Sequence, residues 1–190
     1  MKRLIVSSLV FVLILCSGLV FAQIGHGGEP LSFQKANVLS NKVEHIQLAK
    51  PDMAIIEAED AMFQKNGELY KVGRMLDVNV DINTAGTWDF LDDGTKVWRL
   101  GISAQDAKAL AVYYDKFHLT PGSRLFLYNQ NRKQVIGSFD HRNNSRFGDK
   151  FSTQIIEGET TWLELIIDAN ASEMPVLEIA KVSYLYRGVE

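Results

Sequence analysis

The stretch "WRLGISAQDAKALAVYYDKFHLTPGSRLFLYNQNRKQVIGSF", from Trp98 to Phe139, consists of short runs of aromatic and β-branched residues separated by turn signals. Pro121-Gly122 and the polar segment Asn129–Lys133 bound one run, "RLFLY", whose two faces are both apolar. Such a run is typical of a strand that lies centrally in a sheet or is covered on both sides. The alanines of "DAKALAVYYDKFHL" (106–119) suit a helix, but its valine and tyrosine residues and its short neighbours favour a strand.

The residues on either side continue this pattern. In "RMLDVNVDIN" (74–83), apolar and polar residues alternate, which describes a strand with one face on a core and the other in water. Asp93-Gly94 predicts a hairpin turn into "TKVWRLGIS" (95–103). Three further runs follow Phe139, namely "STQII", "TWLELIID" and "VLEIAKVSYLYRG". Together they predict an all-β protein, an antiparallel β-sandwich with a jelly-roll-like order, over residues 72–190.

Residues 23–71 are expected to form an N-terminal arm that includes one short helix. The segment 23–50 is polar and irregular, so we expect an extended arm that is ordered by packing. Asp52 is a helix-capping residue ahead of a run with helical periodicity, which predicts a helix over Met53–Phe63. The apolar residues expected on the buried face of this helix are Ile55, Ile56, Met62 and Phe63.

The first 22 residues have the pattern of a secretory signal peptide. A basic start, Met1-Lys2-Arg3, precedes an apolar run (4–20) that leads into Val20-Phe21-Ala22. We therefore expect residues 1–22 to be removed and the protein to be secreted, extracellular or in transit through a periplasm. The alternative is a retained membrane anchor, but the serine and glycine residues of the run weaken it as a span. After cleavage, we expect no membrane contact.

The charge and cysteine content narrow the function classes. Removal of the signal peptide takes Lys2 and Arg3 from the 20 basic residues, which leaves 18 against 23 acidic ones and a net charge of −5. A mildly acidic chain without a basic patch is not expected to bind nucleic acid. The single cysteine, Cys16, is lost with the signal peptide, so thiol catalysis and zinc–thiolate sites are not expected either.

An acidic cluster is the first candidate for a metal site. The run "DVNVDI" (77–82) begins like a calcium loop, but Ile82 stands where that loop needs glycine, and Trp88 stands where it needs the closing glutamate. We expect a solvated strand face followed by a hairpin turn, and no metal or cofactor, although calcium binding in another geometry stays open. The acidic residues concerned are Asp77, Asp81, Asp89, Asp92 and Asp93.

No catalytic constellation is apparent. The four histidines, His26, His45, His118 and His141, lack metal-type spacing and are expected in the arm, at a strand end or in a loop. The segment "GISAQ" (101–105) lacks the second glycine of a nucleophile elbow. The sequence therefore predicts a chain that is not itself an enzyme.

Aromatic residues are the remaining candidates for binding. In "TWLELIID" (161–168), Leu163, Leu165 and Ile167 share one face, which leaves Trp162 on the other. Trp162, Trp88, Tyr128 and Tyr186 are the interface candidates, because clustered aromatics stack on sugars or anchor a protein partner. The alternative is that the N-terminal arm covers these aromatics, since large apolar patches are seldom left exposed.

Several short motifs, in a shared order, resemble those of a known family. They are "GGEPLSF" (27–33), "AED" (58–60), "GTW" (86–88), "DGTKVWRLGIS" (93–103), "FHLTPGSRLFLYN" (117–129), "VIGSF" (135–139), "NN" (143–144) and "YLYRG" (184–188). Together they resemble the N-terminal non-catalytic region of secreted trypsin-like serine endopeptidases of the lysyl-endopeptidase type, common in Bacteroidetes. The resemblance covers nearly all of the chain after residue 22.

The resemblance implies a β-sandwich module placed before a chymotrypsin-like protease domain. The chain stops at Glu190, before any histidine-containing or serine-containing motif of such a domain, so no catalytic residue carries over. The expected function is that of a non-catalytic accessory region, truncated before its catalytic domain, whose partner is a trypsin-like protease domain in cis or in trans. The alternative is an independent extracellular module that binds a cell-surface glycan or protein.

Overall fold

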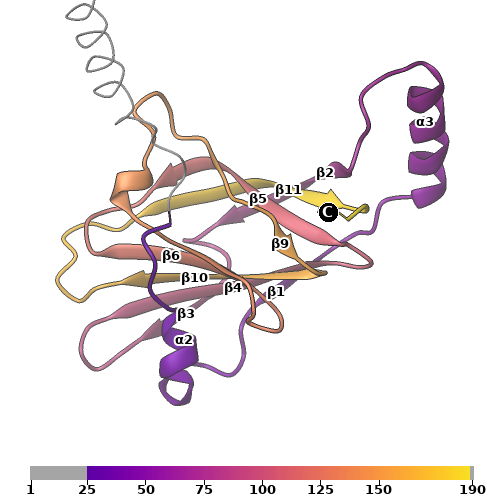
Figure 1. Ribbon diagram of the computed structural model, residues 1–190. Helices are drawn as coiled ribbons and strands as arrows, with labels where there is room; N and C mark the ends of the chain where they lie inside the picture. Colours follow the sequence, from indigo (N-terminus) through magenta and orange to yellow (C-terminus); the bar gives the residue numbers. More distant parts are fainter. Residues whose placement is uncertain (1–24, 189–190) are drawn as a thin grey trace, which may run out of the picture.

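Two β-sheets packed face to face form the body of the chain (Figure 1). The computed structural model describes residues 25–188, so the predicted signal peptide lies outside the described residues. The predicted all-β sandwich is confirmed, and both sheets are antiparallel apart from one parallel edge pair. Among residues 25–188, no helix is long and apolar enough to cross a membrane.

The first sheet, sheet A, has the order β1–β4–β10–β6–β7, and β3 also pairs with β4. The strand β4 has β10 on one side, while β3 and β1 divide its other side: β3 pairs with residues 96–99 and β1 with residues 101–104. The bounds are β1 His45–Leu48, β3 Thr87–Phe90, β4 Lys96–Ala104, β6 Ser123–Asn129, β7 Val135–Phe139 and β10 Thr160–Ile167.

The second sheet, sheet B, has the order β2–β11–β5–β8, and β9 also pairs with β5. The predicted run "STQII" forms only the short pieces β8 and β9, each two residues long. The bounds are β2 Gly73–Asp81, β5 Ala109–His118, β8 Phe151–Ser152, β9 Ile156–Glu157 and β11 Val176–Leu185.

The chain passes repeatedly from one sheet to the other. The first long strand, β2, lies beside the last, β11, and β4 lies beside β10, so that later strands nest between earlier ones. This nesting is the double Greek key of a jelly roll, with β1 and β3 added at one edge of sheet A. The jelly-roll-like order predicted from the sequence is therefore confirmed.

The core lies between the sheets and follows the predicted alternation. Trp98 of β4 and Leu165 of β10 are completely buried, as is Val80 of β2. Each such side chain stabilises the fold by roughly 1.5–3 kcal/mol relative to an exposed one. Gly86 is required beside Trp98, because its φ is +87° and a Cβ there would lie 2.1 Å from the indole Nε1.

The helix α3 (Met53–Lys65) forms where the sequence predicts it, but its buried face is different. Asp52 caps it as expected, since its carboxylate accepts hydrogen bonds from the backbone N–H groups of Ala54 (2.9 Å) and Ile55 (3.3 Å). The predicted apolar stripe is wrong in part, because Ile55 and Met62 are 58% and 65% exposed. The physical reason is that α3 stands away from the sheets (Figure 1) and is held mainly by polar contacts.

The N-terminal arm is more ordered than the sequence predicts. It contains the one-turn helix α2 (Leu31–Gln34), the 3₁₀ turn η1 (Ala36–Val38) and the strand β1, which joins sheet A. The prediction that residues 23–50 are irregular is therefore wrong for these elements. Each element has only three or four residues, which is too short for a periodic pattern to show in the sequence.

Candidate functional site

The N-terminal arm lies across the outer face of sheet A and buries residues that point away from the core. Tyr128 of β6 is 5% exposed, and the ring of Phe33, from α2, meets its ring edge-on at a centroid distance of 4.8 Å. Glu164 of β10 is also on this face and is completely buried. The alternative that the arm covers the aromatics is thus confirmed for Tyr128.

A buried polar triad joins the arm to the sheet. Glu164 accepts hydrogen bonds from the backbone N–H of Ser32 (3.1 Å) and from the hydroxyl of Tyr128 (3.3 Å). The hydroxyls of Ser32 and Tyr128 lie 3.2 Å apart and share a further hydrogen bond. Burial, together with the negative charge of Glu164, raises the pKa of Tyr128 to about 12, so this phenol remains a neutral donor. Carboxylates are rarely buried unless they are bonded in this way.

Arg99 forms a second buried polar group beside this triad. Its Nη2 donates to the carboxylate of Asp89 and to the backbone carbonyl of Ser40, each at 2.7 Å, and Asp89 also accepts the Ser40 N–H at 2.8 Å. Arg99 is the direct cross-strand neighbour of Glu164. Its Nε is buried and has no hydrogen-bond partner within residues 25–188, a condition that costs about 1–3 kcal/mol.

A small cavity lies between the arm and this polar group. Its volume is about 230 Å³, and we call it the arm cavity. The polar and aromatic residues that line it include Ser40, Asn41, Arg99, Tyr128, Gln130, Arg132 and Trp162. Trp162 is partly exposed, and its indole N–H donates to the side-chain oxygen of Gln130 at 2.7 Å. Gly101 lies beneath Trp162, where a Cβ would come within 2.8 Å of the indole ring. None of the described residues that line the cavity is an aspartate or a glutamate.

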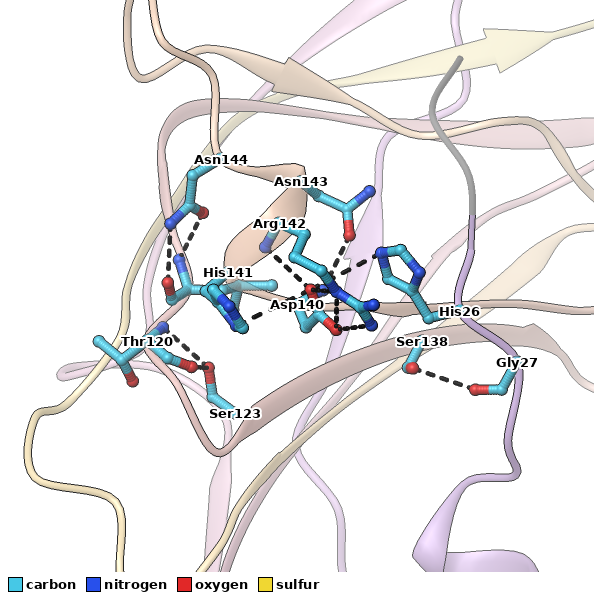
Figure 2. A network of polar contacts seen from close by, with 11 residues as sticks. His26, Gly27, Thr120, Ser123, Ser138, Asp140, His141, Arg142, Asn143 and Asn144 are labelled. Carbon is cyan, nitrogen blue, oxygen red and sulfur yellow. Dashed lines mark hydrogen bonds and ion pairs between the residues drawn. The ribbon is translucent and has the colours of Figure 1, made fainter. Parts of the chain in front are cut away.

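The start of the arm is fastened to β7 and to the loop that follows it (Figure 2). Ser138 bonds two neighbouring residues of the arm: its carbonyl accepts the His26 N–H at 2.8 Å, and its N–H donates to the Gly27 carbonyl at 3.1 Å. The imidazole of His26 lies 3.7 Å from the carboxylate of Asp140. Burial raises the pKa of Asp140, but the hydrogen bonds from Arg142 and the charge of His26 outweigh burial and hold it below its ordinary value.

The strand β1 of the arm is held to β4 by a contact between a histidine and a serine that was not predicted from the sequence. The Nε2 of His45, on β1, lies 2.7 Å from the Oγ of Ser103, on β4, and that hydroxyl donates to the Oε1 of Gln47 at 2.6 Å. A serine hydroxyl has a single proton, and in the arrangement in which Ser103 gives it to Gln47 the imidazole of His45 is the donor to Ser103. A general base would have to accept this proton, so the geometry fits a fastening of β1 rather than an activated serine.

A separate polar cluster holds α3 to the end of β11. The buried Asp60 accepts hydrogen bonds from the Tyr186 hydroxyl (2.7 Å) and from Arg74 (3.2 Å), and it forms an ion pair with Arg187 at 3.1 Å. Arg74 also pairs with Glu59 at 3.0 Å. The hydrogen bond from Tyr186, followed by the contacts with the two arginines, lowers the pKa of Asp60 below its ordinary value.

The structure brings together two of the four predicted aromatics. Tyr128 and Trp162 are register partners on β6 and β10 and line the same cavity. Trp88 lies on β3, where its indole N–H donates to the Ile82 carbonyl at 3.0 Å, and Tyr186 belongs to the α3 cluster. The four candidates therefore do not form one surface.

The acidic cluster divides among separate structural roles. Asp77 pairs with Lys181 (3.2 Å), Asp89 binds Arg99, and Asp93 accepts the Thr95 N–H at 2.9 Å in the hairpin turn. Asp81 accepts from the backbone and side chain of Asn83. Within residues 25–188, no group of histidine, cysteine, aspartate or glutamate residues is arranged to hold a metal ion.

Six residues of the arm cavity region were missed by sequence reasoning: Ser32, Ser40, Asn41, Gln130, Arg99 and Glu164. A signal for the last two was present, because each is a charged residue in the middle of a strand whose neighbours are apolar. Such a residue, on the face that points away from the core, is either solvated or covered by another segment, and only the structure distinguishes these cases.

No known protein-family model matches the chain, and no solved structure matches it.

Proposed function

We propose that this chain is a secreted, non-catalytic β-sandwich module that serves as the accessory region of a trypsin-like serine endopeptidase. Its role is to bind and position a protease domain, in cis or in trans. The order of the quoted motifs supports the family assignment, and one structural observation supports the mode of action. That observation is the exposed apolar face of α3.

The α3 surface, which we define as Ile55 and Met62, is apolar and exposed. Ile55 and Met62 are two helical turns apart and lie on the same face of the helix. Leu69 and Tyr70 follow the helix and are 89% and 70% exposed. Exposed apolar side chains that share one face of a helix typically mark an interaction site.

The polar cluster at Asp60 fixes this surface relative to the sandwich. Arg74 is at the start of β2 and Arg187 follows the end of β11, and both bind the same carboxylate of α3. A rigid attachment reduces the ordering cost of binding, which favours a positioning role. For a partner in cis, Arg187 already lies beside the helix that would contact it.

Site-specific photocrosslinking tests this proposal in the secreting cells. A crosslinking amino acid at Met62 is expected to capture a polypeptide that also reacts with a fluorophosphonate probe, the reagent for an active serine of a trypsin-like enzyme. The matched control carries the same crosslinker at Asn79, which is exposed on β2, on sheet B. Equal capture from both positions, or capture only of proteins that do not react with the probe, contradicts the proposal.

A second candidate function is an extracellular binding module for a glycan or a protein. The observation that favours it is the arm cavity, in which Tyr128 and Trp162 lie beside polar side chains. Ligand sites commonly combine aromatic surface with a few polar groups that fix the orientation of the ligand. The two candidates use different surfaces, so they can be tested separately.

A further inference from the structure

We infer that the arm cavity binds one neutral pyranose residue of a glycan. The inference rests on the second candidate function, the binding module, and is independent of the protease partner proposed above. It depends on three properties of the cavity: its aromatic wall, its arrangement of hydrogen-bonding groups and its charge.

Trp162 supplies the aromatic wall. The side chain is partly exposed, and Gly101 and His45 fix it from beneath and beside: the His45 ring lies edge-on at a centroid distance of 5.4 Å. The hydrogen bond from the indole N–H to Gln130 fixes its rotation. An aromatic ring held in this way presents a rigid apolar surface, on which the C–H face of a pyranose can stack.

The hydrogen-bonding groups around this wall suit hydroxyl groups, which both donate and accept. Asn41 and Gln130 each carry an amide that can do the same, whereas the Ser40 hydroxyl is already bonded to the backbone of Lys42. Arg99 also lines the cavity, and its Nε–H lacks an acceptor among the described residues. This Nε is buried and is not open to the cavity, and the Nη2 already binds Asp89 and the Ser40 carbonyl, so the amides of Asn41 and Gln130 are the groups left for sugar hydroxyls.

The charge of the region favours a neutral ligand over an acidic one. The guanidinium of Arg99 is already paired with Asp89, and the buried carboxylate of Glu164 lies directly across the strand pair. Arg132, at the rim, lies over the ring of Phe33 at 4.8 Å from its centroid. Of the two arginines that line the cavity, Arg99 is therefore already neutralised by Asp89, and only Arg132 at the rim would attract a ligand carboxylate, so an acidic group gains little over a neutral one.

The volume sets the size and the affinity of the ligand. A cavity of about 230 Å³ accommodates a single sugar ring, not an oligosaccharide. A ligand of that size is limited to a dissociation constant of millimolar order. The natural target is therefore the terminal residue of a glycan, bound weakly, and multivalent display would raise its affinity.

Nitrogen-15 NMR of the mature protein tests the inference at the residue concerned. Titration with the methyl glycosides of glucose, galactose, mannose and N-acetylglucosamine is expected to shift the indole N–H signal of Trp162 with at least one of them. The signal of Trp98, which is completely buried and donates to the Ala85 carbonyl, is the internal control and stays unchanged. Glucuronic acid is the matched acidic probe, and a response to it alone overturns the neutral class of ligand.

Variants test whether the arm cavity, rather than another surface of the module, binds the pyranoside. Trp162→Ala and Asn41→Ala are each expected to weaken pyranoside binding, by about tenfold for the tryptophan. Phe90→Ala removes an aromatic that is 72% exposed and lies outside the cavity, and it is expected to bind as the parent does. An unchanged Trp98 signal shows that each variant is folded.

The outcomes are distinguishable on a glycan array. Binding that Trp162→Ala weakens supports the inference. Binding that neither cavity variant weakens overturns the cavity as the site but leaves the binding-module function standing. Absence of binding to every glycan and every pyranoside overturns both the cavity as the site and the binding-module function. None of these outcomes bears on the proposed protease partner.

Discussion

At the scale of single residues, Arg99 shows most clearly how the arm and sheet A depend on each other. Its guanidinium binds Asp89 in the neighbouring strand β3 and the Ser40 carbonyl in the arm, and all three contacts within this group are 2.8 Å or shorter. Side chains in this group are nearly buried, at 9% and 12% exposed for Arg99 and Asp89. Removal of one partner therefore leaves the other as an unpaired buried charge.

We predict that Arg99→Met lowers the free energy of unfolding by about 3–5 kcal/mol, because Asp89 loses its ion-pair partner in a buried setting. Urea denaturation followed by tryptophan fluorescence measures the loss. The matched control is Arg124→Met, which breaks the exposed ion pair of Arg124 with Asp168 (2.7 Å) and is expected to cost about 1 kcal/mol or less. Similar losses in the two variants would show that the Arg99 pair is effectively solvated.

The strand β10 shows which parts of a candidate site can be predicted from a strand pattern. Alternation correctly predicts that Leu163 and Leu165 face the core and that Trp162 faces outward. It does not reveal that Glu164, also on the outward face, is buried, because that depends on Ser32, 132 positions away in the sequence. The aromatic part of the candidate site was therefore predictable, and its polar part required knowledge of what covers the face.

At the scale of elements, the register of β2 determines which side chains of the first long strand reach the core. Val80 is completely buried and packs in the core between the sheets, whereas Asn79 is exposed. We predict that Val80→Asp lowers the free energy of unfolding by several kcal/mol, because it buries a carboxylate without a partner. Asn79→Asp introduces the same residue one position earlier and is expected to change stability by no more than about 0.5 kcal/mol. Equal effects in urea denaturation would place the strand in the other register.

Prediction from sequence succeeded for elements that carry a repeated pattern and failed for those that do not. The long strands β2, β4, β5, β6, β10 and β11 each have seven residues or more, show alternation or short apolar runs, and were all predicted. The strand β1 has four residues and forms by pairing with the edge of β4, where the Gly101 N–H donates to the Glu44 carbonyl at 2.9 Å, and this information is held elsewhere in the chain. For α3, the periodicity correctly predicted the helix. It did not predict that Ile55 and Met62 are exposed, because their exposure depends on the distance between the helix and the sandwich.

The attachment of α3 is expected to depend on the ionised state of Asp60. The folded-state pKa of this carboxyl is below its ordinary value of 3.8, so its contribution is fully present above that pH and is lost as the pH falls through the lower folded value. We predict that Asp60→Asn increases hydrogen exchange of the α3 amides at neutral pH, while the amides of β4 keep their protection. Glu57→Gln, on the exposed part of the same helix, is the control and is expected to leave the exchange of α3 unchanged. Unaltered α3 exchange in Asp60→Asn would mean that apolar contacts, such as that of the buried Ile56, hold the helix.

At the scale of the whole molecule, the sandwich separates two surfaces that the proposals assign to different partners. The arm cavity lies on the outer face of sheet A, and the α3 surface is attached where β2 begins and β11 ends, in sheet B. Additivity of substitutions at distant, independent sites is the general rule. Substitutions in the arm cavity are therefore expected to leave crosslinking from α3 unaffected.

The final prediction concerns catalysis by the chain itself. Ser103 and His45 are within hydrogen-bond distance, but the serine proton is directed to Gln47, and the histidine donates rather than accepts. We therefore expect the purified mature protein to leave a lysyl reporter peptide uncleaved over a prolonged incubation, and Ser103→Ala to behave in the same way. A fluorophosphonate probe is expected not to label Ser103, since labelling requires a serine activated by a base. Turnover that persists through purification and disappears in both Ser103→Ala and His45→Ala would show instead that β1 and β4 hold a working nucleophile, and the accessory role would then belong to an enzyme.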